Sequence, residues 1–212
     1  MTKVEPVAID IHRPDLTVIG RVAGLLLRGG LVAAPTETRY GILARADSEA
    51  VLGKLYRAKR RLAVSPTALF VRDYASFRAL GETNLITDRL IDAFLPGPLT
   101  LVTRAIAQLP DAVAPGGKVG LRISSSPVIA SILAAVDFPL TATSANISGQ
   151  AESETITEII ASFGESVDLY LDGGPLTGLV STVVDCTGIT ARVLRAGAIP
   201  EESIRRVLDR VS

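Results

Sequence analysis

The chain has 212 residues, a length that suits one hydrophobic core, so we expect a single domain over residues 1–212. Hydrophobic residues make up 48% and charged residues 21%, which excludes a disordered or fibrous protein. The formal net charge is zero, but residues 1–122 carry 17 basic and 11 acidic residues, while residues 123–191 carry 8 acidic and no basic ones. This balance argues against a protein that mainly coats nucleic acid and leaves room for a local basic cleft that binds phosphates.

The sequence shows no membrane span or targeting leader, because no apolar run could cross a bilayer and no basic-then-apolar segment opens the chain. We therefore expect a cytoplasmic protein. One cysteine, Cys186, and one histidine, His12, cannot build an internal disulfide or a His/Cys zinc site. Cys186 lies in an apolar run without an activating base and is expected in the core. Catalysis would have to use other groups.

The first half of the chain alternates between helical and extended patterns. Apolar spacing predicts a helix over 16–28, closed by Gly29 and Gly30, and a short strand over 31–34 that stops at Pro35. Asp47 or Ser48 can cap a helix that runs to Lys59. A strand is expected over 67–71, and a helix over 85–94 that ends before Pro96.

The second half continues the alternation. Strands are expected over 99–103, 119–123, 139–143, 169–171, 182–186 and 191–194. Helices are expected over 127–136, from the capping box of Thr155 and Glu158 to Gly164, and from Pro200 onward. The whole pattern predicts an α/β fold with a twisted mixed sheet, parallel and antiparallel, and flanking helices.

Two loops rich in small polar residues follow predicted strands, over 35–41 and 143–149. Loops at the ends of strands in an open α/β sheet commonly present backbone N–H and hydroxyl groups to a ligand. We expect the two loops to border one crevice. The alternative is that these residues are ordinary turn formers.

A basic run lies between these loops: Lys54, Arg57, Lys59, Arg60 and Arg61 fall within eight residues that include no acid. Such a run is often a solvated helix flank. It could also hold a polyphosphate, because guanidinium groups bind phosphate oxygens in pairs and lysine adds a point charge. Arg122 stands alone in an apolar strand, where it needs either a structural salt bridge or the carboxylate or phosphate of a substrate.

Seven short motifs, in order, resemble the threonylcarbamoyl-AMP synthase family, also known as YrdC, Sua5 or TsaC. They lie at Pro35–Gly41 (P-T-D-T-x-Y-G in the family), Lys59–Arg61 (K-x-R), Pro96–Thr100 (P-G-P-x-T), Gly120–Arg122 (x-x-R), Ser144–Gly149 (S-A-N-x-S-G), Ser181–Asp185 (S-T-V-V-D) and Leu194–Gly197 (L-R-x-G). The resemblance covers nearly the whole chain. It implies a YrdC-like fold with a concave basic cleft, in the short form without a further C-terminal domain.

The resemblance implies an enzyme that joins L-threonine, bicarbonate and ATP into threonylcarbamoyl-AMP and pyrophosphate, for the N6-threonylcarbamoyladenosine at tRNA position 37. ATP would be held by Lys59, Arg61, Ser65, Ser144, Asn146 and Arg195, with Lys59 and Arg61 as the catalytic cations. Threonine would be held by Thr38, Arg122, Ser181 and the backbone of Ala142. Mg²⁺ would come with ATP. A tRNA-modifying transferase complex or tRNA would be a transient partner.

This chain departs from the family pattern at a few positions. Glu37 replaces the usual Asp, Ser65 the usual Asn or Lys, and Phe70 a His that contacts the amino acid in some members. Two alternatives stay open: another acyl-adenylate enzyme on this scaffold, or an RNA-binding protein without synthase activity. The aromatic content of 4% offers few stacking platforms for RNA.

Overall fold

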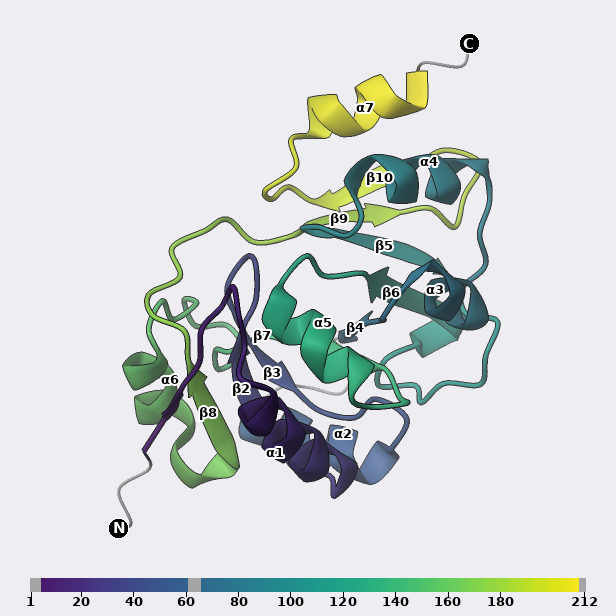
Figure 1. Cartoon of the computed structure of the whole chain (residues 1–212). Helices are drawn as coiled ribbons and strands as arrows, with labels where there is room; N and C mark the ends of the chain where they lie inside the picture. Colours follow the sequence, from purple (N-terminus) through teal and green to yellow (C-terminus); the bar gives the residue numbers. More distant parts are fainter. Residues whose placement is uncertain (1–4, 61–65, 210–212) are drawn as a thin grey trace.

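The computed structural model describes residues 5–60 and 66–209, which contain ten strands, seven α-helices and two 3₁₀ turns (Figure 1). The strands are β1 (Val7–Ala8), β2 (Val32–Pro35), β3 (Tyr40–Leu43), β4 (Ala68–Phe70), β5 (Leu99–Arg104), β6 (Lys118–Arg122), β7 (Leu140–Ser144), β8 (Leu169–Asp172), β9 (Thr182–Asp185) and β10 (Arg192–Arg195). The helices are α1 (Leu16–Leu27), α2 (Glu49–Ala58), α3 (Tyr74–Leu80), α4 (Leu85–Phe94), α5 (Pro127–Ala134), α6 (Ile156–Phe163) and α7 (Glu201–Asp209), with 3₁₀ turns at Pro115–Gly117 and Gly164–Ser166.

All ten strands join one mixed sheet, in the order β1-β8-β2-β3-β7-β4-β6-β5-β9-β10. The pairs β1–β8, β2–β8, β4–β6 and β5–β9 are parallel and the others antiparallel. The expected twisted mixed sheet with flanking helices is confirmed. β8 and β9 are consecutive in the chain but lie near opposite ends of the sheet, so residues 173–181 cross from one side of the molecule to the other (Figure 1).

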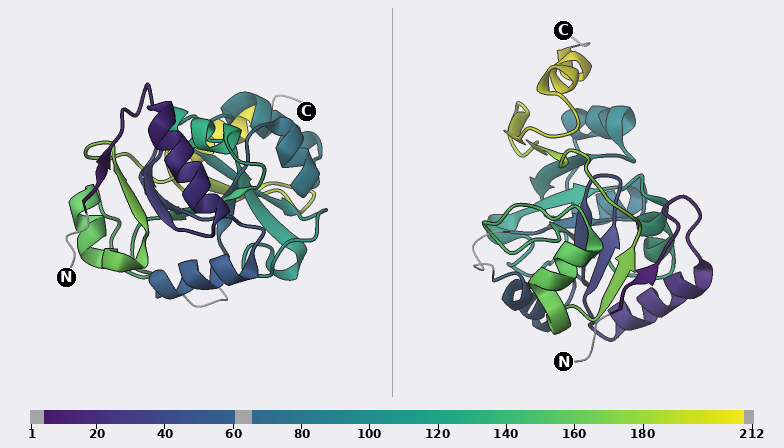
Figure 2. Two further views of the ribbon diagram at one scale, coloured as in Figure 1. Left: turned by 60° about the horizontal axis from the view of Figure 1, so that its bottom comes forward. Right: turned by 90° about the vertical axis from the view of Figure 1, so that its left-hand side faces the viewer.

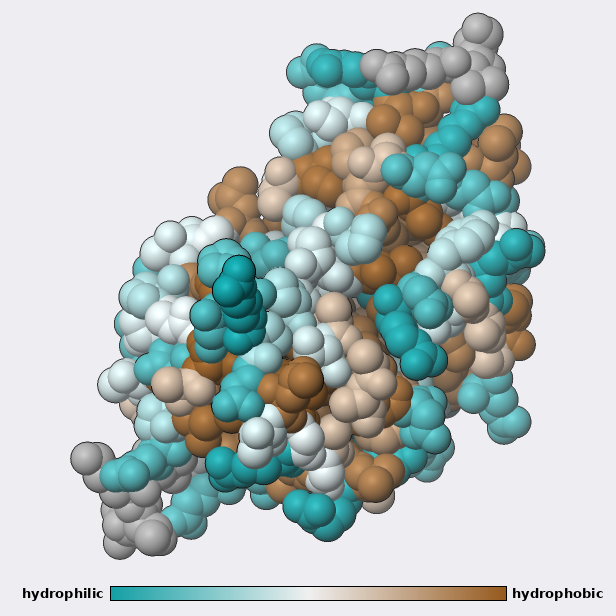
Figure 3. Space-filling model, viewed as in Figure 1, coloured by the Kyte–Doolittle hydropathy of each residue, from teal (hydrophilic) through white to brown (hydrophobic). Residues whose placement is uncertain are grey.

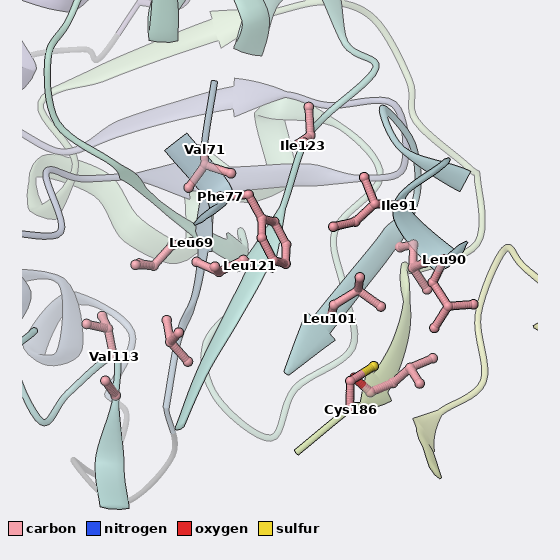
Figure 4. Packing of buried hydrophobic residues seen from close by; sticks show 14 of the residues in the cluster. Leu69, Val71, Phe77, Leu90, Ile91, Leu101, Val113, Leu121, Ile123 and Cys186 are labelled. Carbon is pink, nitrogen blue, oxygen red and sulfur yellow. The ribbon is translucent and has the colours of Figure 1, made fainter. Parts of the chain in front are cut away.

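Three hydrophobic clusters hold the helices against the sheet. α1 and α5 pack against alternate residues of β2, β3 and β7. α2 and α6 pack against the intervening residues of β2 and β3, so the two helix pairs lie on opposite faces of this part of the sheet (Figure 2). The third cluster joins α3, α4 and α7 to β4, β6, β5 and β9. Figure 4 shows Phe77 of α3 beside Leu121, and Leu90 and Ile91 of α4 toward Leu101.

Local signals in the sequence account for several helix ends. Thr155 accepts from the backbone N–H of Glu158, whose carboxylate accepts from the Thr155 N–H, so the predicted capping box is confirmed. Asn84 and Thr87 form a second capping box that starts α4. Ser48 occupies the N-cap of α2 but makes no side-chain capping bond.

Three elements are absent from the sequence-based assignment. β1 is only two residues long, too short for a periodic pattern. β3 begins at Tyr40 inside the segment expected to be a loop, because residues 40–43 carry no polar alternation and are buried on both faces of the sheet. α3, over Tyr74–Leu80, is a seven-residue helix with one buried residue, Phe77, and so shows little helical periodicity.

The outer surface seen in Figure 3 mixes apolar and polar residues, with apolar residues gathered in the upper half beneath α7. Large apolar side chains with high exposure include Leu179, Leu194 and Ile189, the last 98% exposed. Across residues 5–60 and 66–209, no helix is both long enough and apolar enough to span a membrane.

Candidate active site

A cavity of about 420 Å³ lies on the strand face opposite α3 and α4. β6 shows how the sequence builds it, because side chains alternate along a strand. Val119 and Leu121 point into the core, whereas Lys118, Gly120 and Arg122 line the cavity. Neighbouring strands contribute small residues to the same face: Ala68, Thr100, Val102, Ala142 and Val183. No α-helical residue of the described chain lines the cavity, so strands and loops alone form its walls.

The two polar loops predicted to share a crevice do border this cavity. Thr36 and Thr38 from the first loop and Ser144 from the second line it, and β3 and β7 pair directly, with Gly41 opposite Ser144. The first loop is rigid because the Thr36 hydroxyl oxygen accepts from the N–H groups of Thr38 (3.1 Å) and Arg39 (3.2 Å). The cavity spreads over the sheet face as well as the strand ends.

Arg122 is 5% exposed and lies at the end of β6. Its Nη2 lies 2.8 Å from a carboxylate oxygen of Glu37 and 3.3 Å from the Thr38 hydroxyl oxygen, and its Nε donates to the Gly97 carbonyl at 3.1 Å. The guanidinium also lies 5.5 Å from the ring centroid of Phe70. The structural salt bridge considered from the sequence is therefore present, and the same residue lines the cavity.

Arg195 and Ser181 form a second polar pair in the cavity wall. Arg195 donates through Nε to the Ser181 carbonyl (3.0 Å) and through Nη2 to its hydroxyl (2.9 Å). Burial lowers the pKa of the Arg195 guanidinium; the charge of Glu152 opposes this shift and the charge of Arg122 adds to it. Arg195 has no carboxylate within 4.0 Å among the described residues, so its charge is available to an anionic ligand.

Lys59 is 2% exposed and does not line the cavity. Its ammonium group donates to the backbone carbonyls of Ser144 and, at 2.8 Å, of Asn146. Asn146 is also absent from the lining: its side chain accepts from the Ser144 hydroxyl (2.6 Å) and donates to the Gln150 carbonyl (2.7 Å). These contacts tie the end of α2 to the loop after β7. Arg61 and Ser65 lie outside the described residues.

The charge of the cavity is mixed. Arg39 pairs with Glu154 at 3.0 Å and lies 3.8 Å from Glu152, and Lys118 lies 3.5 Å from Asp185. Together with the Arg122–Glu37 pair, these contacts neutralise three of the four cations that line the cavity among the described residues. The expected basic cleft is therefore not shown. Away from the cavity, Lys54 of the basic run pairs with Asp168 at 2.6 Å, as a helix flank would.

Several residues of the site were not singled out from the sequence. Tyr40 is 1% exposed and lines the cavity, and its hydroxyl accepts from the Gly173 N–H (3.0 Å) and donates to the Gly174 carbonyl (2.7 Å), which anchors the crossing segment. Thr67 is 2% exposed, lines the cavity, and has a hydroxyl without a hydrogen-bond partner among residues 5–60 and 66–209. Glu37 has three contacts beyond its own loop. Proximity of this kind leaves no local signal in a sequence.

The thiol of Cys186 lies in the core and not in the cavity lining. Cys186 is 1% exposed in the core, where burial raises the pKa of its thiol to about 12. Within residues 5–60 and 66–209, no group of three or more His, Cys, Asp and Glu side chains could hold a metal ion. Among the described residues, the polar side chains that line the cavity offer hydroxyl groups, three guanidinium groups, the Lys118 ammonium group and the carboxylates of Glu152 and Asp185.

Comparison with known proteins identifies relatives along most of the chain. A Methanocaldococcus jannaschii protein is 35% identical over 85% of this chain and 86% of its own length. Threonylcarbamoyl-AMP synthases of Mus musculus and Pyrococcus abyssi are 35% and 31% identical over 85% and 89% of this chain. The chain spans 68% of the mouse protein and 56% of the Pyrococcus protein.

Solved structures agree with these relatives. The crystal structure of P. abyssi Sua5 in complex with L-threonine superposes with a TM-score of 0.92 at 30% identity, covering 97% of this chain and 61% of that one. Escherichia coli YciO, at 22% identity and a TM-score of 0.85, shares the fold. Residues 24–197 match the Sua5/YciO/YrdC family, which carries the description "Telomere recombination". With its sheet, its cavity and its relatives in agreement, the chain belongs to the Sua5/YciO/YrdC family.

Proposed function

We propose that this protein is a threonylcarbamoyl-AMP synthase, which makes threonylcarbamoyl-AMP and pyrophosphate from L-threonine, bicarbonate and ATP. One observation carries the proposal: a single cavity collects residues from five distant motifs, at Thr38, Arg122, Ser144, Ser181 and Arg195. These are the positions at which the resemblance expects ligand contacts. The cavity volume of about 420 Å³ falls in the range of small-molecule sites, roughly 300–1,000 Å³.

The threonine site would lie around Arg122. Its guanidinium suits the carboxylate of an amino acid, because its positive charge and the N–H groups of Nη1 can form charge-assisted hydrogen bonds to a carboxylate oxygen. The hydroxyls of Thr38 and Ser181 and the backbone of Ala142 lie in the same cavity wall and offer polar contacts to the amino and hydroxyl groups. Phe70, which replaces a family histidine, offers an apolar surface beneath Arg122.

The ATP phosphates would lie between Ser144 and Arg195. Arg195 carries an unpaired charge, and Ser144 starts the loop that Lys59 and Asn146 hold in shape. The resemblance implies that Lys59 and Asn146 contact ATP directly. We propose instead that both support the loop after β7, because neither lines the cavity. Arg61 and Ser65 are proposed as further ATP contacts; both lie outside the described residues.

Mg²⁺ would enter with ATP. This ion prefers phosphate oxygens and retained water to an all-protein cage, and the Ser144 hydroxyl, unlike the cationic Arg195, could offer it an oxygen ligand in the cavity wall. Bound there, it would neutralise charge on the phosphates.

The residue set suits a reaction that needs positioning and charge stabilisation. The threonine amine takes up the carbon of bicarbonate with loss of water, which gives a carbamate. An oxygen of the carbamate then attacks the α-phosphorus, the bond from that phosphorus to the bridging oxygen breaks, and pyrophosphate leaves. Guanidinium groups held in place can stabilise the developing charge without a nucleophilic side chain.

The product points to further partners. Threonylcarbamoyl-AMP is an activated acyl donor, so we propose a transient encounter with a transferase complex or with tRNA, in the cytoplasm where tRNA and ATP are present. We also propose that residues 1–212 act as one domain, supported by the single sheet that runs through the described residues.

The test is pyrophosphate release from the purified chain, with calorimetry of L-threonine and then ATP·Mg²⁺. Release should require both threonine and bicarbonate. Arg122→Ala should raise the KM for threonine by at least tenfold, and Arg195→Ala the KM for ATP. Release that needs neither co-substrate would overturn the proposal, as would tight RNA binding that survives high salt. The comparisons do not favour that RNA-binding alternative.

A further inference from the structure

Glu37 lies beside the cavity without lining it, and its side chain is 14% exposed. One carboxylate oxygen lies 2.8 Å from the Arg122 Nη2 and accepts from the Ser125 N–H at 3.1 Å. The other accepts from the Ser124 hydroxyl. Burial opposes ionisation of this carboxyl, but the charge of Arg122 and the hydrogen bond from Ser124 hold its pKa below its usual value. Glu37 is therefore a buried, ionised and fully engaged carboxylate.

These contacts fix the orientation of Arg122. Its Nε is held by the Gly97 carbonyl and its Nη2 by Glu37 and Thr38. Among the described residues, Nη1 has no hydrogen-bond partner, and the side chain borders the cavity. Nε and Nη2 are thus bonded to the protein, while Nη1 is left for a ligand.

The same contacts explain how Arg122 stays buried. A guanidinium that is 5% exposed would be strongly destabilising without a counter-ion, because the protein interior solvates charge poorly. Glu37, which does not line the cavity, supplies the counter-charge. It also joins three segments around Arg122: the 36–39 loop, the end of β6 and the connection from β6 to α5.

We propose that Glu37 is a positioning residue that orients Arg122 for the carboxylate of the amino-acid substrate. This inference rests on the proposed function. It predicts that loss of Glu37 weakens binding of the amino-acid carboxylate and of no other substrate group. Because no bond to the carboxylate forms or breaks in the reaction, its binding contributes equally before and at the transition state, so the loss should appear in KM for threonine with kcat retained.

The decisive variant is Glu37→Gln, which keeps the size of the side chain but offers one acceptor oxygen in place of two. Its amide N–H₂ would face either Arg122 or Ser124, both of which donate. The KM for L-threonine should rise at least tenfold, while the KM for ATP stays within twofold. Glu37→Asp restores the charge and should recover most of the threonine affinity, because Asp is the usual residue in the resembling motif.

A substrate without the carboxylate isolates the effect. L-threoninamide should lose far less affinity than L-threonine in Glu37→Gln, measured by calorimetry, because its neutral amide accepts only a weaker hydrogen bond from Arg122 and has no charge to pair with it. Asp47→Asn serves as a matched control: it breaks the Arg45–Asp47 pair at 2.7 Å, outside the cavity, and should leave both affinities unchanged. If Glu37→Gln does not fold, Ser124→Ala weakens the same carboxylate anchor and should raise the threonine KM severalfold.

The outcomes distinguish failure of the proposed function from failure of the role proposed for Glu37. A wild type without threonine-dependent pyrophosphate release overturns the proposed function and this inference with it. An active wild type whose threonine KM is unchanged in folded Glu37→Gln overturns this inference alone. Equal losses for threonine and threoninamide would also overturn it, since they would mean a general distortion of the cavity.

Discussion

The Lys59 ammonium group donates to the Asn146 carbonyl at 2.8 Å, and the Lys59 carbonyl accepts from the Ser148 N–H at 3.0 Å. Lys59 therefore contacts the loop after β7 through both its side-chain ammonium group and its backbone carbonyl. A residue expected from the resemblance to grip phosphates is 2% exposed, and its charge satisfies backbone oxygens. The first consequence of removing it should be a loss of structure around Ser144.

Lys59→Met should destabilise the protein. Hydrogen bonds from a charged group contribute about 1.5–3 kcal/mol each, and the carbonyls left behind belong to partly buried residues, so we expect the free energy of unfolding to fall by about 2–4 kcal/mol. Denaturant titration measures this. Lys54→Met is the control on the same helix: its partner Asp168 lies 2.6 Å away but both side chains are more than a third exposed, so the loss should stay below about 1 kcal/mol. Equal losses in the two variants would contradict the assigned role.

Thr67→Val should not destabilise the protein. The Thr67 hydroxyl is buried without a partner, so replacing it with a methyl group removes an uncompensated polar atom and should leave stability unchanged or raise it by about 1 kcal/mol. Thr141→Val is the contrasting buried site, because its hydroxyl accepts from the Ala44 N–H and donates to the Ile42 carbonyl. That change should cost about 1–3 kcal/mol. Thermal unfolding of both variants decides, and a loss at Thr67 as large as that at Thr141 would refute the prediction.

The sequence predicts this fold well where periodicity and capping are local. The helix over 16–28, the capping box at Thr155 and the burial of Cys186 each depend on residues close together in the chain. The strand order and β3 depend on pairings between distant segments. Nothing local tells that residues 40–43 pair with both β2 and β7.

The candidate site shows the same division. Motifs indicated which loops share a cavity: β2 and β7 both pair antiparallel with β3, so they run in the same direction and the loops after them lie at the same edge of the sheet. They did not indicate that Lys59 lies behind the cavity, or that Glu37 holds Arg122, since these depend on side-chain direction and on the curvature of the sheet. The neutralising pairs of Arg39 and Lys118 likewise join residues more than 60 positions apart, which a count of charges along the chain cannot reveal.

Cys186 should be unreactive in the folded protein. Only the thiolate attacks a disulfide reagent, and burial in the α4–β9 core raises the thiol pKa to about 12. At pH 8 an aromatic disulfide reagent should therefore label the native chain far more slowly than the same chain in guanidinium. The ratio of the two rates is the measurement. Native labelling as fast as denatured labelling would mean that the thiol is exposed.

Glu37 should make the protein acid-sensitive through Arg122. Its pKa is lowered from the ordinary value of 4.5, so the unfolded chain binds a proton at Glu37 more readily than the folded chain does. The carboxylate therefore contributes its full stabilisation above pH 4.5, and loses it as the pH falls through the lower, folded-state pKa. Glu37→Gln has no proton to bind at this position.

The difference in free energy of unfolding between wild type and Glu37→Gln should then be constant from pH 7 to about pH 5 and shrink below it, because protonation of Glu37 leaves Arg122 with a neutral neighbour in both proteins. Denaturant titrations at pH 7, 5, 4 and 3 measure the curve. A difference that stays flat down to pH 3 would mean that the ionised carboxylate adds nothing to stability, and that Arg122 is held by Gly97 and Thr38 alone.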